Sequence, residues 1–531
     1  MNPTSILTPA AGSGWPVLSL LIALPLVAAI IVALMRNESR ARHVAVVAAL
    51  AELVLALTMV IGFVPGTADL QYVERHAWIP TLGIGYSVGV DGISLLFVPL
   101  AALIACGALL ATAGGVRFMP RLFCANVLLM LAATVGIFVA LDLFLFYVFY
   151  ELALIPAFLL IKLWGQGSQR AHAGMKYVLY MLCGSVPLML GFILVALQHQ
   201  EVSGNLSFDW ATLMATPVEG GRGTLVFALL VLGFAVKGPL LPLHTWMPAA
   251  VSEGPVGVGV FLVGLKLGAY GFLRFVMPLA PEASAEWSLV IAALGVTAML
   301  YAALVALVQR NLRRLLAFAS ISHVGLVTMG LFTLTPEGMQ GGVLMLLAMG
   351  ITSTGLLLLA GSLHARLGSS ELSSFGGLTR QMPRLATLFF ILGIASVGMP
   401  GTLNFNGEFL VLVGSFNLHP ALAGTAVLGV ILSAGYFLWY YERAFFGPPG
   451  RHAAARLPDL NRRETLVAGV LAGLAIMGGL FPAKLQEVTA PSVQALLAHV
   501  QAHVPAQVSA QAQAQTGTGP VALAARAAPA R

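Results

Sequence analysis

The sequence predicts an all-α polytopic membrane protein of about fourteen transmembrane helices. Of its 531 residues, 59% are hydrophobic and only 9% are charged, whereas soluble domains are roughly a quarter charged. The mean hydropathy is +0.93. Apolar runs of roughly 18 or more residues recur from Val17 to Phe481, and each can cross a hydrocarbon core of about 30 Å as a helix. This pattern excludes a soluble globular fold.

The apolar runs, read against polar loop residues, place the helices along the chain. The expected spans are 15–35, 43–64, 88–112, 119–140, 142–163, 174–197, 223–247, 255–277, 286–308, 312–333, 339–363, 383–418, 420–446 and 464–482. The seventh span should be interrupted just after Lys237, because Pro239 lacks an amide hydrogen and clashes with the carbonyl of Ala235. Pro400 and Gly401 mark a second interruption, in the twelfth span.

The lysines and arginines of the short loops predict the orientation in the membrane. Alternate connections carry most of these bases, namely Arg36, Arg40, Arg42, Arg117, Arg121, Arg170, Lys176, Arg310, Arg313, Arg314, Arg366, Arg380, Arg384, Arg443, Arg451, Arg456, Arg462 and Arg463. We expect this set in the cytoplasm and both termini on the non-cytoplasmic side of a bacterial inner membrane. After Pro482 we expect one short amphipathic helix, near 484–503, and a disordered tail from about Ala506.

Charge, cysteines and motifs exclude several classes of partner and cofactor. The formal net charge is +7, but the basic residues are scattered and not interleaved with aromatic residues, so we expect no nucleic-acid partner. Cys106, Cys124 and Cys183 lie singly in apolar segments, which favours neither a disulfide framework nor a zinc or iron–sulfur site. We see no cleavable signal peptide before Trp15 and no nucleotide-binding glycine loop. Any redox chemistry is therefore expected in partner proteins.

Four of the charged residues inside the expected spans are singled out: Glu151 in the fifth, Lys237 in the seventh, Lys266 in the eighth and Glu408 in the twelfth. An ionised group there costs several kcal/mol unless it is paired or neutralised. Interrupted spans in both halves of a chain are typical of the ion or substrate site of a repeat-built transporter. These residues predict a proton relay. The alternatives are a lysine that snorkels to the interface and a static Glu–Lys pair that holds helices together.

Several other polar residues leave their role open. His323, in FASISHVGLV, titrates near physiological pH and suits a relay, although a membrane histidine is as often a hydrogen-bond donor between helices. His244 has the same two interpretations. Glu52, in the middle of the second span, is equally a relay member or a helix-packing carboxyl. Asp142 and Lys162 lie near the ends of the fifth span, where anchoring at the membrane interface is favoured.

Four segments of the chain resemble the antiporter-like subunits of proton-pumping NADH:quinone oxidoreductase, respiratory complex I. They are DLFLFYVFYELALIPAFLLIKLWG, GFAVKGPLLPLHTWMP, RRLLAFASISHVGLV and GMPGTLNFNGEFLVLVGSF. Together they cover most of 140–420, and the resemblance in span count covers nearly the whole chain. Glu408 stands where the sister subunits usually carry lysine. A glutamate at this place resembles the subunit M branch of the family.

The resemblance implies two inverted five-helix repeats, each contributing a half-channel. The implied divisions are helices 1–3 at 1–118, the first repeat at 119–278, the second repeat at 279–447, a loop and helix 14 at 448–484, and a short helix and tail at 485–531. Glu151 resembles the fifth-helix glutamate, Lys237 its seventh-helix partner, Lys266 the central lysine, His323 the tenth-helix histidine and Glu408 the exit-side acid.

The resemblance also implies where the redox chemistry takes place. Quinone reduction elsewhere in the complex would drive proton movement here through charge changes along the membrane arm. NADH, FMN, iron–sulfur clusters and quinone would all bind to partner subunits, and this chain would hold no cofactor. Its partners would be the other membrane-arm subunits, including the sister antiporter-like subunits, and the lipid bilayer.

The chain departs from the family pattern near the middle of the path. It has Pro248-Ala249-Ala250-Val251 where the family commonly has Pro-Asp-Ala-His, and Met349 where the family has a second relay histidine. Lys266 follows Pro255 by two residues fewer than the family spacing, which turns a helical side chain by roughly 200°. Lys266 is therefore predicted to face another direction unless Gly257 and Gly259 absorb the change.

Three interpretations follow from the sequence. The first is a proton-translocating subunit of complex I with a divergent central relay. The second is the equivalent subunit of a membrane-bound hydrogenase or a multisubunit cation/proton antiporter. The third is a structural membrane-arm subunit that no longer conducts, against which Lys237 beside Pro239 and the intact Glu151 argue.

Overall fold

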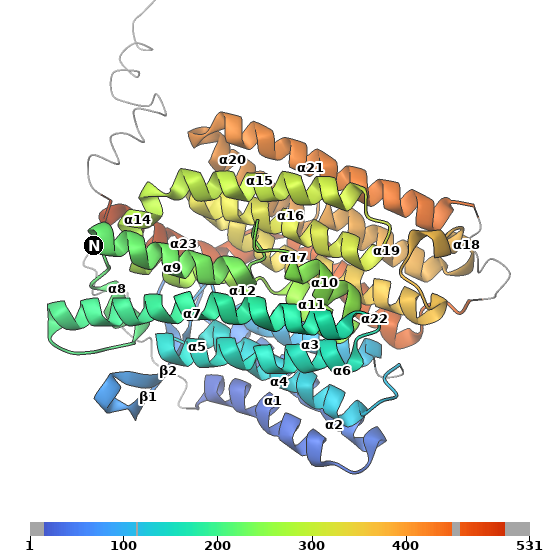
Figure 1. The fold of residues 1–531 in the computed structure, drawn as a ribbon, viewed down its shortest axis with the longest axis horizontal. Coiled ribbons are helices and arrows are strands. Elements are labelled where there is room, and N and C mark those ends of the chain that lie inside the picture. The colour runs from blue at the N-terminus through green and yellow to red at the C-terminus, as the bar shows by residue number, and fades with distance from the viewer. Residues whose placement is uncertain (1–14, 113–114, 449–456, 505–531) are drawn as a thin grey trace, which may run out of the picture.

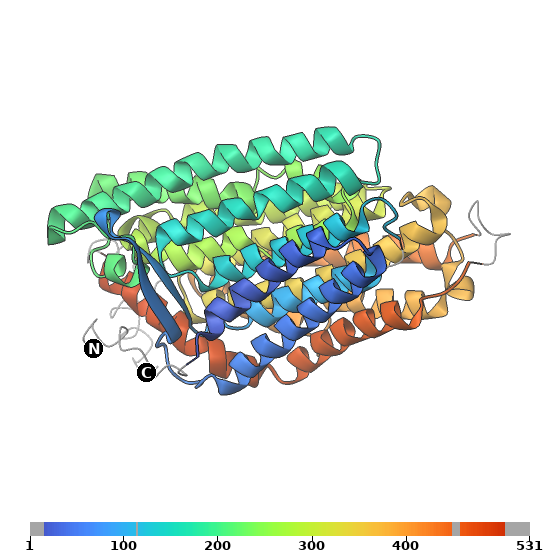
Figure 2. The same cartoon turned by 90° about the horizontal axis from the view of Figure 1, so that it is seen from below.

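The computed structural model describes residues 15–112, 115–448 and 457–504 and is mostly helical. Its helices run roughly parallel in one elongated bundle (Figures 1 and 2). In the described part of the chain, twelve helical segments are long and apolar enough to cross a membrane. Two shorter apolar helices accompany them, α3 (Phe97–Thr112) and α19 (Pro383–Ser396). The predicted polytopic helical fold is confirmed, while the count of about fourteen spans stays a prediction.

The twelve long segments follow the expected order along the chain. They are α1 (Val17–Leu34), α2 (Glu38–Gly62), α4 (Pro120–Val139), α5 with α6 (Leu143–Leu152, Leu154–Trp164), α7 (Arg170–Ser203), α9 (Gly220–Lys237), the segment Val256–Leu279, α15 (Ser288–Leu307), α16 (Leu312–Phe332), α17 (Pro336–Leu367), α21 with the π-helix η5 (Pro420–Tyr441, Glu442–Phe446) and α22 (Arg462–Leu480). The segment Val256–Leu279 comprises α11 (Val256–Gly264), α12 (Leu267–Gly271), the π-helix η3 (Phe272–Val276) and α13 (Met277–Leu279).

Shorter elements complete the chain. They are the 3₁₀ turns η2 (Pro80–Leu82) and η4 (Leu372–Ser374) and the helices α8 (Trp210–Met214), α10 (Trp246–Glu253), α14 (Pro281–Glu286), α18 (Leu378–Gln381), α20 (Leu403–Leu418) and α23 (Pro482–Ala502). The short helix expected near 484–503 corresponds to α23, which Gln340 anchors through a hydrogen bond from Nε2 to Thr489 Oγ1 at 2.6 Å. The tail predicted from Ala506 lies outside the described residues.

One β-hairpin interrupts the otherwise helical fold. Strands β1 (Gln71–Ile79) and β2 (Ile84–Val90) pair antiparallel, with Glu74 opposite Val88. The span expected at 88–112 therefore begins too early, because α3 starts only at Phe97. Asp91 ends the strand by accepting hydrogen bonds from the amides of Ile93 and Ser94 at 3.1 and 3.0 Å. A short apolar strand that runs into an apolar helix gives no change in hydropathy, so periodicity alone does not separate the two.

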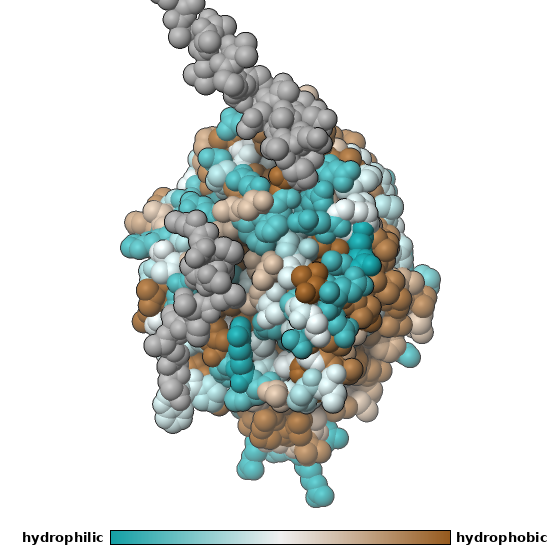
Figure 3. Space-filling model, turned by 90° about the vertical axis from the view of Figure 1, so that its left-hand side faces the viewer, coloured by the Kyte–Doolittle hydropathy of each residue, from teal (hydrophilic) through white to brown (hydrophobic). Residues whose placement is uncertain are grey.

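Helices α16 and α17 and the segment Val256–Leu279 form the interior of the bundle. The most apolar stretch of α16 is completely buried, and those of the other two are 89% and 94% buried. Helix α16 packs closely on α15. A Cβ on Gly325 would collide with the backbone of Gly295, so only glycine fits at this contact. In the end-on view of Figure 3, hydrophilic residues gather over the end of the bundle and apolar residues cover its flank. Polar side chains on α16 therefore meet protein and not lipid.

Both predicted interruptions are present. Helix α9 ends at Lys237, and Leu240 N donates to Ala235 O at 3.0 Å, the acceptor that Pro239 cannot serve. The freed carbonyl of Val236 then accepts a hydrogen bond from the Trp246 indole at 2.8 Å. In the twelfth span, α19 ends at Ser396 and α20 begins at Leu403. Two glycines between them adopt φ values of +75° at residue 398 and +89° at residue 401.

Candidate functional site

Glu151 and Lys237 meet where α5 ends beside the end of α9. The Lys237 ammonium donates to the carbonyl oxygen of Tyr150 at 2.9 Å and lies 3.4 Å from the centre of the Tyr150 ring. Glu151 follows Tyr150 directly in the chain, so its carboxyl stands beside the carbonyl that binds Lys237. The two charged groups thus share one site without a direct ion pair in the described structure. Both residues are only partly buried in the isolated chain.

The helical backbone is interrupted just after Glu151, at the end of α5. Helix α5 ends at Leu152 and α6 starts at Leu154, with Ala153 between them. Pro156 lacks the amide that would bond to the carbonyl of Leu152, so the helix is weakened at this turn. The fifth span therefore contains an interruption that the sequence analysis did not predict.

Lys266 stands at a break in the eighth span. Helix α11 ends at Gly264, Leu265 is extended with φ −104° and ψ 116°, and α12 begins at Leu267. The Lys266 ammonium donates a hydrogen bond to the Ser320 hydroxyl on α16, and Lys266 is only 4% exposed. Lys266 thus faces the protein interior. Counting residues from Pro255 does not predict the direction of the Lys266 side chain, because the helix is broken at Leu265 and the rotation per residue is no longer regular.

The broken ends of α9 and α12 are packed directly together. A Cβ on Gly268 would collide with the backbone of Gly238 and with the carbonyl of Phe234. Two glycines at this contact therefore bring the segments that carry Lys237 and Lys266 side by side. A cavity of about 20 Å³ between them is lined by Lys237, Thr134 and apolar neighbours. That volume is sufficient for roughly one water molecule.

His323 and Glu408 lie next to each other in the second half of the bundle. His323 Nδ1 is 3.8 Å from Glu408 Oε1, and their side chains are 3% and 5% exposed. Neither ring nitrogen of His323 has a hydrogen-bond partner among the described residues. The backbone at Gly398 packs against the Glu408 carboxyl, because a Cβ there would collide with it. The interrupted twelfth span therefore brings its break and its acid to the same point.

Four polar side chains form one line through the buried core: Lys266, Ser320, His323 and Glu408. We call them the Lys266–Glu408 chain. Ser320 and His323 are three residues apart on α16, so they are neighbours on one helix face. Sequence reasoning missed Ser320, although its spacing from His323 was visible in ASISH. The structure brings Glu151 close to Lys237 and joins Lys266, His323 and Glu408 in this chain.

The remaining polar candidates do not join that line. His244 is 4% exposed and packs against the rings of Tyr301 and Phe318. Glu52 is completely buried on α2, and neither carboxyl oxygen has a hydrogen-bond partner among the described residues. Met349 is completely buried on α17 and supplies only a weak thioether acceptor at the place of the missing histidine.

The two residues expected at the ends of the fifth span have distinct local roles. Asp142 caps α5, because its Oδ1 accepts from the amides of Phe144 and Leu145 at 2.9 and 3.0 Å. Lys162 is exposed in the last turn of α6, with its ammonium 5.3 Å from the ring centre of Phe158. The exposed position of Lys162 agrees with interface anchoring.

A buried ion pair escaped the sequence analysis altogether. Arg274, in the π-helix η3, donates to both carboxylate oxygens of Asp91 at 2.8 and 3.0 Å. Its Nε donates to the Tyr270 hydroxyl at 3.2 Å, and its guanidinium lies 4.7 Å from the ring of Trp210. The two charged side chains are 2% and 8% exposed. This bidentate pair joins the turn after β2 to the end of the broken eighth span.

The comparisons with known proteins agree with this architecture. Residues 140–433 match the family described as NADH:quinone oxidoreductase/Mrp antiporter, TM. The chain is also 36% identical over 505 residues to NADH-quinone oxidoreductase subunit M of Rhodobacter capsulatus, covering 91% of this chain and 97% of the relative.

The chain belongs to the antiporter-like subunit family of NADH:quinone oxidoreductase. A chain of respiratory complex I from Thermus thermophilus with bound NADH superimposes with a TM-score of 0.83 at 34% identity, covering 91% of this chain and 99% of that one. The Mrp complex from Dietzia sp. DQ12-45-1b shares the fold, with a TM-score of 0.80 at 22% identity over 92% and 99% of the two chains. Among the described residues, no group of three or more His, Cys, Asp or Glu is placed to hold a metal.

Proposed function

We propose that this chain is a proton-translocating membrane-arm subunit of NADH:quinone oxidoreductase. Its relay runs through Glu151, Lys237, Lys266, His323 and Glu408. The observation that supports this most strongly is the Lys266–Glu408 chain, which crosses the buried, apolar part of helix α16 at Ser320 and His323. Ionisable groups at this depth are costly to bury, and proton pathways are their best-known use in membranes.

Each member of the Lys266–Glu408 chain has a chemical role. The Lys266 ammonium is the donor, and the Ser320 hydroxyl accepts a proton on its oxygen while releasing its own. His323 takes up a proton on one ring nitrogen and releases one from the other, which requires both nitrogens to be free of fixed partners. Glu408 is the terminal acceptor. The 3.8 Å gap to His323 exceeds hydrogen-bond distance, so transfer needs a small side-chain movement or one bridging water.

Close packing connects the Glu151–Lys237 site with the segment that carries Lys266. Glu151 and Lys237 lie at the same site, so a change of charge at either one alters the electric field at the other. The packed glycines 238 and 268 then place Lys237 near the break that carries Lys266. A charge change transmitted from outside this chain can in this way shift a proton step by step along the membrane plane.

The same proposal covers the surroundings of the chain. NADH, FMN, iron–sulfur clusters and quinone bind to partner subunits, and no redox centre belongs to this chain. The chain is divided into helices 1–3, two inverted repeats at 119–278 and 279–447, and a C-terminal part. It lies in a bacterial inner membrane with both termini on the non-cytoplasmic side. The interrupted helices near Lys237 and Glu408, one in each proposed repeat, support this division.

The test is proton pumping by vesicles that contain the assembled complex with Lys237→Ala. We expect fewer protons translocated per NADH oxidised, because the donor beside Glu151 is removed. Lys162→Ala is the matched control, since this lysine is exposed at the end of α6. An unchanged stoichiometry in a fully assembled Lys237→Ala complex would falsify the relay.

A further inference from the structure

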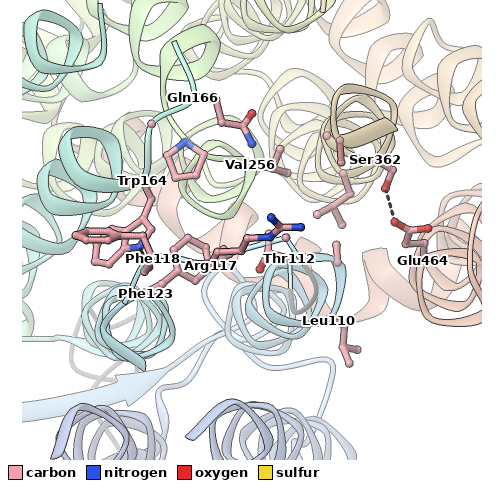
Figure 4. Close-up of a pocket in the computed structure, with 18 of the residues that line it drawn as sticks. Leu110, Thr112, Arg117, Phe118, Phe123, Trp164, Gln166, Val256, Ser362 and Glu464 are labelled. Atoms are coloured by element: carbon pink, nitrogen blue, oxygen red, sulfur yellow. Dashed lines mark hydrogen bonds between the residues drawn. The ribbon is translucent and has the colours of Figure 1, made fainter. Parts of the chain in front are cut away.

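A large cavity opens at the end of the bundle where α3 ends and where α11 and α22 begin. Its volume is about 710 Å³, and its walls come from α3, α4, α6, α11, α17 and α22 (Figure 4). None of the five relay residues lines it. The cavity is therefore separate from the proposed proton path, and its properties do not depend on that proposal.

The cavity wall is strongly cationic. Arg117, Arg170 and Arg463 line it, and Arg117 and Arg463 form no ion pair or side-chain hydrogen bond within the described structure. In Figure 4 the guanidinium of Arg117 lies between Thr112 and the helices opposite. These two arginines sit on separate elements, one after α3 and one in the first turn of α22.

The one carboxylate among the described lining residues does not balance this charge. Glu464 is bound by Arg366, whose Nη2 lies 2.5 Å from Glu464 Oε2. It also accepts hydrogen bonds from the Ser362 hydroxyl at 3.3 Å, drawn in Figure 4, and from the backbone amide of Asn461 at 2.9 Å. Because Arg366 neutralises Glu464, the three lining arginines leave the cavity with an uncompensated positive charge. An anionic occupant complements it.

Part of the wall is apolar, and this part together with the arginines calls for an amphiphile. Leu110, Phe123, Leu163, Val256 and Leu358 line the same space as the arginines. A free phosphate ion would satisfy the arginines and leave these side chains facing water. A phospholipid has a charged head group joined to hydrocarbon, and basic pockets between transmembrane helices are known sites for anionic head groups. The volume lies within the range of about 300 to 1,000 Å³ that is typical of ligand sites.

We propose that this cavity binds the head group of an anionic phospholipid, with its phosphate held by Arg117 and Arg463 and its hydrocarbon against the apolar wall. The bound lipid bridges α3, α11, α17 and α22, which are far apart in the sequence. It therefore stabilises the packing of the N-terminal helices against the C-terminal ones.

The experiment uses the purified, assembled complex and a photoactivatable phosphatidylglycerol. We expect cross-links to peptides that contain Phe123 or Leu358, and competition by unlabelled phosphatidylglycerol but not by phosphatidylethanolamine or inorganic phosphate. Arg117→Ala combined with Arg463→Ala should weaken this labelling roughly 25-fold, because each arginine near a lipid phosphate contributes about a factor of five. Arg310→Ala is the matched control, since this exposed arginine lies outside the cavity.

Three results would overturn the proposal. Equal labelling of the double variant would show that the two arginines do not hold the lipid. Equal competition by phosphatidylethanolamine or by inorganic phosphate would exclude an anionic-lipid site. No lipid adduct on these peptides, while the surface of α1 is labelled, would show that phospholipid does not occupy the cavity. Labelling at the surface of α1, which faces outward, serves as the internal standard for non-specific lipid contact.

Discussion

Replacing Ser320 by alanine removes the hydroxyl that accepts from Lys266 and lies one helical turn before His323. The Lys266 ammonium is 4% exposed and donates to this hydroxyl. Losing a hydrogen bond to a buried charged group costs about 1.5 to 3 kcal/mol. If that loss raises the activation free energy of proton transfer by the same amount, the transfer slows roughly 10- to 150-fold, because about 1.4 kcal/mol corresponds to a factor of ten in rate.

The assay is NADH-driven acidification of inverted vesicles, recorded together with NADH oxidation. Ser320→Ala should lower the number of protons translocated per NADH while the complex still assembles. Ser322→Ala is the matched control: it lies on the same helix and is equally buried, but its hydroxyl donates to Met299 O at 2.9 Å, away from Lys266. Equal losses in the two variants, or normal pumping by Ser320→Ala, would refute the role assigned to this hydroxyl.

Three further predictions concern groups outside the relay. Glu52→Gln should leave thermal stability and pumping unchanged, because a buried carboxyl without partners is expected to be neutral; a pumping defect would place Glu52 in the path. Arg274→Met should destabilise the assembled chain by about 3 to 5 kcal/mol, and adding Asp91→Asn should restore much of it; equal thermal midpoints for the two variants would contradict this. Burial lowers the pKa of His499 on α23, whose Nε2 is 3.0 Å from Pro278 O. Since the folded pKa is below the unfolded value of about 6.5, docking of α23 should weaken as pH falls below that value. Hydrogen exchange of α23 checks this, and His499→Gln should abolish the pH dependence.

Much of the fold could be predicted because the relevant physics is local. The interruption after Lys237 follows from the missing amide of Pro239, and the one before Glu408 from glycines that adopt positive φ. The buried charges stood out in apolar runs, so each relay candidate was visible in the sequence. The helix near 484–503 was likewise predictable from its amphipathic pattern.

The features that escaped prediction depend on contacts between distant segments. The direction of Lys266 is set by a break held against the end of α9 through two glycines, and no residue count along one helix reveals it. Asp91 and Arg274 are 183 positions apart, so their pairing cannot be inferred from a single sequence. The hairpin at 71–90 was hidden because its second strand is apolar and leads into the apolar helix α3 without a change in hydropathy.

The most direct test of the relay is the proton stoichiometry of the complex with Glu408→Gln. Glutamine keeps the volume of the side chain in its buried site but cannot accept a proton from His323. Glu442→Gln is the control, since Glu442 is exposed in η5. We predict fewer protons per NADH for Glu408→Gln and an unchanged ratio for the control. An unchanged ratio in an assembled Glu408→Gln complex would contradict proton transfer along the Lys266–Glu408 chain.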